Sequence, residues 1–159
     1  MKNLIATAGT TLVIFLFAVC LSTHAEVHLP AIFSDGMVMQ QQTHANLWGT
    51  ATPNKKVTVH TSWDGKLYAA TADKQGAWKL AVSTPEAGGP YTVTFDDGTP
   101  KVLSNILIGE LWLCSGQSNM EMPMKGFKNQ PVENANMDIL RSRNSEIRLF
   151  TVKRTSTFT

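Results

Sequence analysis

The stretch KVTVHTSWDGKLYA, residues 56–69, decides the fold class of this chain. Apolar residues alternate with polar ones in its first half, as in a strand with one buried face, where Val57 and Val59 share a side. Asp64-Gly65 follows, and both residues tolerate the positive φ angles of a tight β-turn. The stretch therefore predicts an antiparallel hairpin and places the chain among β proteins.

Short strands separated by turn residues continue on both sides of this hairpin. Strand-like stretches occur at residues 46–49, 77–80 and 91–95, and glycine-containing turns occur near residues 75–76 and 96–98. Strands this short with turns this regular are typical of an antiparallel sandwich, and no run with helical periodicity interrupts them. We therefore predict a β-sandwich region, jelly-roll-like, over residues 26–100.

Three tryptophans, Trp48, Trp63 and Trp78, are spaced fifteen residues apart in this region. Exposed, they would be platforms on which sugar rings stack, which would make residues 26–100 a non-catalytic carbohydrate-binding module. Buried, they would supply the aromatic packing that stabilises a small sandwich. We favour the buried interpretation and keep the binding module as the alternative.

The character of the sequence changes after Pro100. Residues 102–114 are almost continuously apolar, which is typical of a strand buried on both faces in a parallel sheet flanked by helices. Residues 131–143 have the apolar spacing of a helix, and residues 146–152 alternate like a strand. We therefore predict that residues 101–159 are the first β-α-β portion of an α/β domain, which stops after one crossover.

Ser118 stands where the predicted buried strand ends, in the stretch LWLCSGQSNMEM, residues 111–122. At this edge of a parallel sheet a serine can attack an acyl carbon, while backbone N–H groups stabilise the oxyanion. Gly116 permits a close backbone approach, and Gln117 and Asn119 hold either the substrate or the turn itself. Spacing alone favours a capping or turn role for the serine over a catalytic role.

The same block resembles the first conserved block of the SGNH-type sialate O-acetylesterases, on residues 112–123. The similarity extends through most of the chain after residue 25, in order along the sequence. The matching stretches are LPAIFSDGMVMQ (29–40), WG (48–49), GGPYTV (88–93), IGE (108–110) and IRLF (147–150).

The resemblance implies a hydrolase that removes O-linked acetyl groups from sugars, sialic acid above all, with plant-type polysaccharides as an alternative substrate. It implies a β-sandwich region beside an SGNH-hydrolase-like α/β domain, and no metal or organic cofactor. Ser118 matches the nucleophile, whose own N–H would serve the oxyanion. Gly116, Gln117 and Asn119 match positions around the oxyanion and the substrate.

The sequence departs from the family pattern in one respect. The family has an Asp-x-x-His pair that supplies the general base and its orienting carboxylate, and no aspartate here is followed by histidine three positions later. After residue 25 the only histidines are His28, His44 and His60, all upstream of Ser118. We therefore expect an N-terminal fragment, apparently truncated, that is itself inactive.

The first 25 residues have the pattern of a secretory signal peptide. Lys2 gives a positive start, residues 11–21 are an apolar core too short to span a bilayer, and small residues precede a cleavage site after Ala25. We predict a secreted or periplasmic protein without stable membrane insertion after cleavage.

Composition narrows the classes of ligand. The net charge is +2, and it falls to +1 without Lys2, so nucleic acid is not an expected partner. Without Cys20 a single cysteine, Cys114, remains, which excludes an internal disulfide. The histidines are too far apart for a metal-ligand pattern. An O-acetylated carbohydrate is the expected partner.

Overall fold

The computed structural model describes residues 26–153, and the predicted signal peptide with its cleavage site after Ala25 lies outside the described residues. Seven strands and two helices make up the described part. They are β1 (Val38–Gln40), β2 (His44–Thr50), β3 (Lys56–Thr61), β4 (Leu67–Thr71), β5 (Ala77–Ser83), β6 (Gly88–Asp96), β7 (Lys101–Gly109), α1 (Ser118–Glu121) and α2 (Ala135–Arg141). Neither helix within residues 26–153 is long and apolar enough to cross a bilayer.

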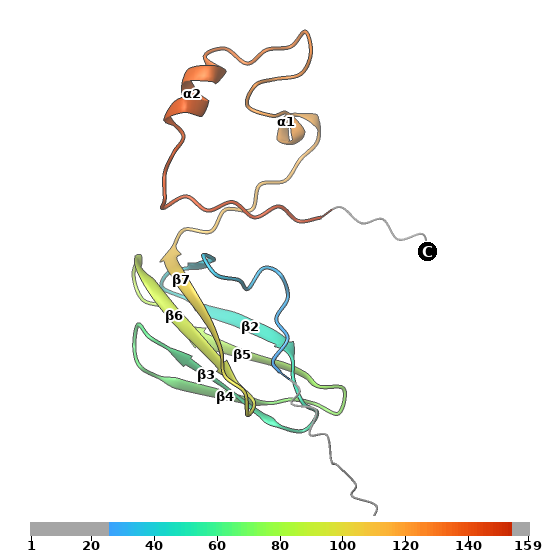
Figure 1. Ribbon diagram of the computed structural model, residues 1–159, viewed down its shortest axis with the longest axis vertical. Helices are drawn as coiled ribbons and strands as arrows, with labels where there is room; N and C mark the ends of the chain where they lie inside the picture. The colour runs from blue at the N-terminus through green and yellow to red at the C-terminus, as the bar shows by residue number, and fades with distance from the viewer. Residues whose placement is uncertain (1–25, 154–159) are drawn as a thin grey trace, which may run out of the picture.

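The strands form two sheets (Figure 1). One has five strands in the order β1-β7-β6-β3-β4, and the other pairs β2 with β5. All pairs are antiparallel except β1 with β7, which run parallel with Val38 opposite Leu107. This mostly β architecture confirms the strand-rich fold, whereas the division into a sandwich and an SGNH-type domain stays a prediction.

The predicted hairpin is confirmed as β3 and β4, with Val59 opposite Tyr68. Val57 and Val59 are fully buried on one face of β3, as their alternation predicts. Residues 62–66 connect the two strands, and Gly65 takes the positive φ of +65° expected in this turn. The local sequence thus sets both the strand faces and the position of the turn.

One hydrophobic cluster joins the two sheets. Leu47 and Val82 contribute from the two-stranded sheet, and the fully buried Phe95 contributes from the five-stranded sheet. Trp78 of β5 packs against Phe95 with ring centroids 6.0 Å apart. The stability of the β strands therefore comes from burial between the sheets.

The three tryptophans have different environments. Trp78 is buried at 4% exposure, and Trp63 packs against the core, as the buried interpretation predicts. For Trp48 that interpretation is wrong, because its side chain is 43% exposed and meets Phe33 edge-on at 4.6 Å. Trp48 lies on the outward face of β2, next in sequence to the fully buried Leu47.

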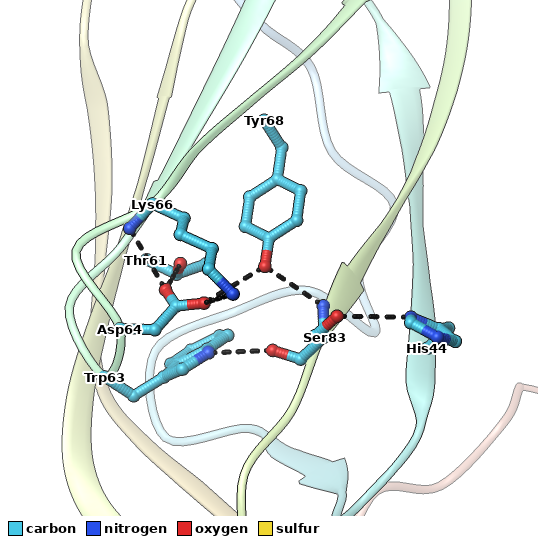
Figure 2. A network of polar contacts seen from close by, with 7 residues as sticks. All are labelled: His44, Thr61, Trp63, Asp64, Lys66, Tyr68 and Ser83. Carbon is cyan, nitrogen blue, oxygen red and sulfur yellow. Dashed lines mark hydrogen bonds and ion pairs between the residues drawn. The ribbon is translucent and has the colours of Figure 1, made fainter.

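A polar network fixes the β3–β4 hairpin to β5, as Figure 2 shows. The Asp64 carboxylate accepts hydrogen bonds from the Thr61 hydroxyl at 2.6 Å and the Tyr68 hydroxyl at 3.1 Å. Tyr68 in turn accepts from the Ser83 N–H, while the Trp63 indole N–H donates to the Ser83 carbonyl at 2.9 Å. The turn is thereby held against the neighbouring sheet.

The predicted strand over residues 102–114 is wrong in its length, its burial and its place. β7 ends at Gly109, and its buried residues alternate with exposed ones except at one irregularity, so only one face is covered. It pairs with β6, so residues 101–109 lie in the same sheet as strands before Pro100. Residues 110–117 form no strand, since no neighbouring strand pairs with them.

The remaining predictions after β7 have mixed outcomes. α2 confirms a helix within residues 131–143, although it covers only Ala135–Arg141. The strand predicted over residues 146–152 is wrong, because in the described part of the chain this stretch pairs with no strand: it begins in a turn and continues as irregular structure. The predicted β-α-β crossover is therefore absent from residues 101–153.

Candidate functional site

Ser118 lies on a long segment that leaves the end of β7 and extends beyond both sheets (Figure 1). Side chains at the end of β1 and just after it hold the start of this segment. The Gln41 amide donates to Glu110 at 2.6 Å, and the Gln40 amide donates to the same carboxylate at 3.3 Å. The Oε1 atom of the Gln40 side chain accepts from the Leu111 N–H at 2.9 Å. The direction in which the segment leaves the sheet is therefore fixed.

Glu110 keeps its charge at this junction. The hydrogen bonds from Gln41 and then Gln40 lower the pKa of its carboxyl below the ordinary value of 4.5, because both stabilise the ionised form. The carboxylate therefore remains an acceptor at neutral pH. Its role in the structure is to hold the start of the segment, eight residues before Ser118.

Ser118 is the first residue of the short helix α1. Gln117 occupies the N-cap position without a side-chain cap hydrogen bond, so the capping role considered for Ser118 is wrong. The backbone turn is closed instead by the Met120 N–H to the Gln117 carbonyl at 2.9 Å and the Met122 N–H to the Ser118 carbonyl at 3.0 Å. The serine side chain takes no part in forming the turn.

The Ser118 side chain is exposed, and its hydroxyl has no hydrogen-bond partner among residues 26–153. Gly116, Gln117 and Asn119 are exposed beside it in the same turn. The structure therefore brings the four predicted residues together only as sequence neighbours. It leaves the hydroxyl accessible to a molecule from solvent.

Gly116 has a steric function in this turn. A Cβ atom built on it would lie 2.7 Å from the Cγ atom of Met120, which is closer than real Cβ contacts come. The absence of a side chain lets Met120 fold over the residues that precede Ser118. The close backbone approach expected at Gly116 stays a prediction, since the atom that comes near it belongs to a side chain.

None of the three histidines in the described residues hydrogen-bonds to Ser118. His28 and His60 lie at exposed positions of the β-strand region, and His44 lies on β2. The His44 Nδ1 atom is 3.2 Å from the Ser83 hydroxyl, across the strand pair β2–β5 (Figure 2). Sequence reasoning missed this serine–histidine pair, since its partners are 39 residues apart and meet only through strand register.

The described residues show no group of three or more His, Cys, Asp or Glu side chains that would hold a metal ion. A shallow hollow lies between the loop before α2 and the start of that helix, and Ser118 is not among its lining residues. Its lining includes Lys125, Pro131, Val132 and Ala135. The polar side chains within four residues of Ser118 in the sequence are the hydroxyl of Ser115, the thiol of Cys114, the amides of Gln117 and Asn119, and the carboxylate of Glu121.

Comparison with known proteins decides the family. No family model matches the chain. The sialate O-acetylesterase of Homo sapiens is 30% identical over 115 residues, which cover 66% of this chain and 22% of the human protein. That of Mus musculus is 31% identical over 127 residues, covering 73% of this chain and 23% of the mouse protein. The chain belongs to the sialate O-acetylesterase family, as a distant member.

A solved structure agrees with this family assignment. The crystal structure of a carbohydrate acetylesterase from Xanthomonas citri matches with a TM-score of 0.58 and 36% sequence identity, over 62% of this chain and 23% of that one. The resemblance seen in the sequence is therefore confirmed at the level of the family. The chain spans less than a quarter of the length of the family members it matches.

Proposed function

We propose that this chain is the nucleophile-bearing portion of a carbohydrate O-acetylesterase, with Ser118 as the residue that attacks the ester. The Ser118 hydroxyl would add to the acetyl carbonyl and lose its proton to a base. The sugar hydroxyl then leaves, and water hydrolyses the acetyl-serine in a second step. The observation that carries the proposal is an exposed serine, whose hydroxyl has no hydrogen-bond partner among residues 26–153, inside the block that resembles the family.

The turn around Ser118 suits acyl transfer in two further respects. The backbone carbonyls of Gln117 and Ser118 accept the two hydrogen bonds that close the turn. The geometry of the turn therefore does not depend on the serine side chain. Gln117 and Asn119 are exposed on either side of the serine, and in the described part of the chain their side-chain amides make no hydrogen bonds that the substrate would have to break. With Gly116 they would contact the oxyanion or the acetylated sugar.

The general base would come from polypeptide beyond the described residues. A serine at its ordinary pKa is a poor nucleophile, and a positioned base contributes roughly 10²–10⁴-fold to the rate. The matched relatives are more than four times longer than the aligned part, which leaves ample sequence for a histidine and its carboxylate. The chain alone would therefore hydrolyse esters only weakly.

The substrate would be an O-acetylated carbohydrate, either sialic acid or a plant-type polysaccharide. The names of the relatives support the sugar ester as a class. The predicted signal peptide would place the enzyme in the periplasm or outside the cell, where such glycans are found. The reaction needs no metal or organic cofactor.

The test uses the longest polypeptide that the reading frame encodes. Replacing Ser118 with Ala should reduce hydrolysis of p-nitrophenyl acetate and of O-acetylated sialic acid at least a hundredfold. Ser83→Ala is the matched control, because Ser83 already has a histidine partner within 3.2 Å and yet should leave the rate unchanged. Equal rates in the Ser118→Ala variant and its parent would overturn the proposal, and so would a loss confined to Ser83→Ala.

A carbohydrate-binding module remains the second candidate, and the exposure of Trp48 favours it. The residue is 43% exposed and its ring packs edge-on against Phe33, which suits a stacking platform. Trp78 is buried, and Trp63 is partly buried against the core with its indole N–H bonded to the Ser83 carbonyl, so both suit this role less well. Titration of the chain with acetylated and deacetylated glycans separates the two functions: saturable binding lost in Trp48→Ala, without esterase activity in the longer polypeptide, would favour the module.

A further inference from the structure

The turn before β1 is held rigidly against β7. Its Asp35 carboxylate accepts hydrogen bonds from the Ser104 N–H at 2.6 Å and the Ser104 hydroxyl at 3.0 Å. The Gly36 N–H donates to the Ser104 carbonyl at 3.0 Å, and the Met37 N–H closes the turn on Ser34. These bonds leave the Gly36 carbonyl free to point away from the sheet and accept a donor from elsewhere.

β7 carries a bulge at the same place. Between the paired residues Leu103 and Ile106 it has two residues, Ser104 and Asn105, whereas the facing stretch of β6 has only Thr92. Asn105 adopts a positive φ of +56°, the conformation that asparagine tolerates best among residues with a side chain. A bulge bends the strand and redirects side chains, and here it directs the Asn105 amide toward the segment after α2.

The extra residue adds no buried side chain to the sheet. Leu103, Ile106 and Ile108 are buried, while Ser104 and Asn105 are both exposed. Without Asn105 the burial of β7 would alternate regularly from Leu103 to Ile108, as in an ordinary strand. The bulge therefore serves contacts outside the sheet.

Arg148 occupies the position that the turn and the bulge create. Its Nη1 donates to the Gly36 carbonyl at 3.0 Å, and its Nη2 donates to the Asn105 Oδ1 atom at 3.2 Å. Its Nε donates to the Ser145 carbonyl at 2.8 Å, which shapes its own segment. A Cβ at Gly36 would lie 2.8 Å from Nη1, so the glycine makes room for the guanidinium.

We propose that Arg148 is a positioning residue that fastens the far end of the Ser118 segment to the β1–β7 edge. Glu110 fastens the near end to Gln40 and Gln41 on the same edge. Residues 110–148 then form a loop closed by two polar anchors, and the position of Ser118 relative to the sheets depends on both. This inference concerns the attachment of the segment and does not require that Ser118 be a nucleophile.

The test follows detachment of the segment by chymotrypsin cleavage of the 159-residue chain after Phe150, two residues beyond Arg148. Phe150 is already 54% exposed, but the hydrogen bonds of Arg148 restrain the backbone beside it, and a protease needs a mobile stretch around the bond it cleaves. Arg148→Gln should therefore accelerate cleavage about tenfold through the loss of charge-assisted hydrogen bonds. Arg148→Lys keeps the positive charge but loses the planar guanidinium group with its several donors, so its cleavage rate should lie between those of the parent and Arg148→Gln. Arg143→Gln removes a nearby exposed arginine and should cleave like the parent.

A double-mutant cycle distinguishes a specific anchor from general loosening. Asn105→Asp offers Arg148 a carboxylate and should slow cleavage about threefold in the parent. In the Arg148→Gln background it should have no such effect. Deleting Asn105 should accelerate cleavage as much as Arg148→Gln does, with the thermal unfolding of the sheets retained. The proposal is overturned by parental cleavage of Arg148→Gln, by equal acceleration in Arg143→Gln, or by an Asn105→Asp effect independent of Arg148.

Discussion

The strands over residues 26–109 and the segment over residues 110–153 contain similar kinds of apolar side chains but bury them very differently. Among the described residues sixteen hydrophobic side chains are buried, and Ala135 is the only one of them after Ile108. In the segment Leu113 is 91% exposed and Leu149 is 93% exposed. The two regions therefore differ in stability: the strands are held by a core, and the segment by a few polar contacts.

This difference shows what an apolar run in a sequence establishes. A run such as residues 111–114 indicates that these side chains are suited to burial, but strand formation also needs a neighbour for the backbone. β7 has β1 and β6 beside it, whereas residues 111–114 have no strand beside them. Hydrophobicity therefore indicates which side chains favour burial, but whether they are buried depends on the chain around them.

The largest expected effect comes from truncating one apolar side chain in each region. Phe95→Ala should lower the free energy of unfolding by about 3–5 kcal/mol, since Phe95 is fully buried against Trp78. Leu149→Ala should change it by less than about 0.5 kcal/mol. Urea denaturation followed by circular dichroism measures both. Similar losses in the two variants would contradict the contrast between the regions.

Two glycines with positive φ provide the next comparison. A Cβ on Gly76 (φ +85°) would lie 2.5 Å from the Ala51 carbonyl oxygen, so Gly76→Ala should cost about 2–3 kcal/mol of global stability. Gly126 (φ +78°) is as crowded, against the Gln130 carbonyl. Because Gly126 lies in the segment, Gly126→Ala should leave global unfolding within about 0.5 kcal/mol. Thermal melts of both variants test whether the segment contributes to cooperative unfolding.

The pH dependence of the unfolding free energy is expected to show a smaller difference between the two regions. Burial raises the pKa of the Asp64 carboxyl, but hydrogen bonds from Thr61, Lys66 and Tyr68 outweigh it and hold the pKa below the ordinary 3.8. The stabilisation is therefore present above pH 3.8 and is lost as the pH falls through the lower value of the folded state. Asp64→Asn should flatten this dependence of unfolding free energy on pH.

Glu110 is the counterpart outside the sheets. Its pKa is also lowered, by Gln41 and Gln40, but it anchors only the start of the segment. Glu110→Gln should leave the acid dependence of global unfolding unchanged while the Leu111 amide exchanges its proton faster. An equal flattening in both variants would show that the segment unfolds together with the sheets.

The smallest effect is expected from a surface ion pair. Lys101 contacts Glu26 at 3.0 Å, and both side chains are partly exposed, at 33% and 49%. Lys101→Ala should destabilise the sheets by less than about 1 kcal/mol, and the loss should shrink as salt is added. Lys125→Ala in the segment serves as the control and should show no salt dependence of global unfolding. A larger loss of unfolding free energy in Lys125→Ala than in Lys101→Ala would contradict the conclusion that the strands, and not the segment, determine global stability.

The sequence predicts best where local signals suffice. The hairpin of residues 56–69 follows from alternation and Asp64-Gly65, and the family follows from the block around Ser118. The parallel pairing of β1 with β7 joins residues 69 positions apart, and no local pattern indicates it. The same applies to Arg148, whose partners become adjacent only through the bulge at Asn105. Contacts that depend on the pairing of residues far apart in the sequence therefore could not be predicted from local patterns.

Cys114 gives the exposed segment an experimental use. It is exposed, and it is the only cysteine after residue 25. A maleimide dye attached there would sit four residues from Ser118 and two residues from Trp112 in the sequence. A single labelled position could thus follow in real time how this part of the chain changes when glycan, or the rest of a longer polypeptide, is added.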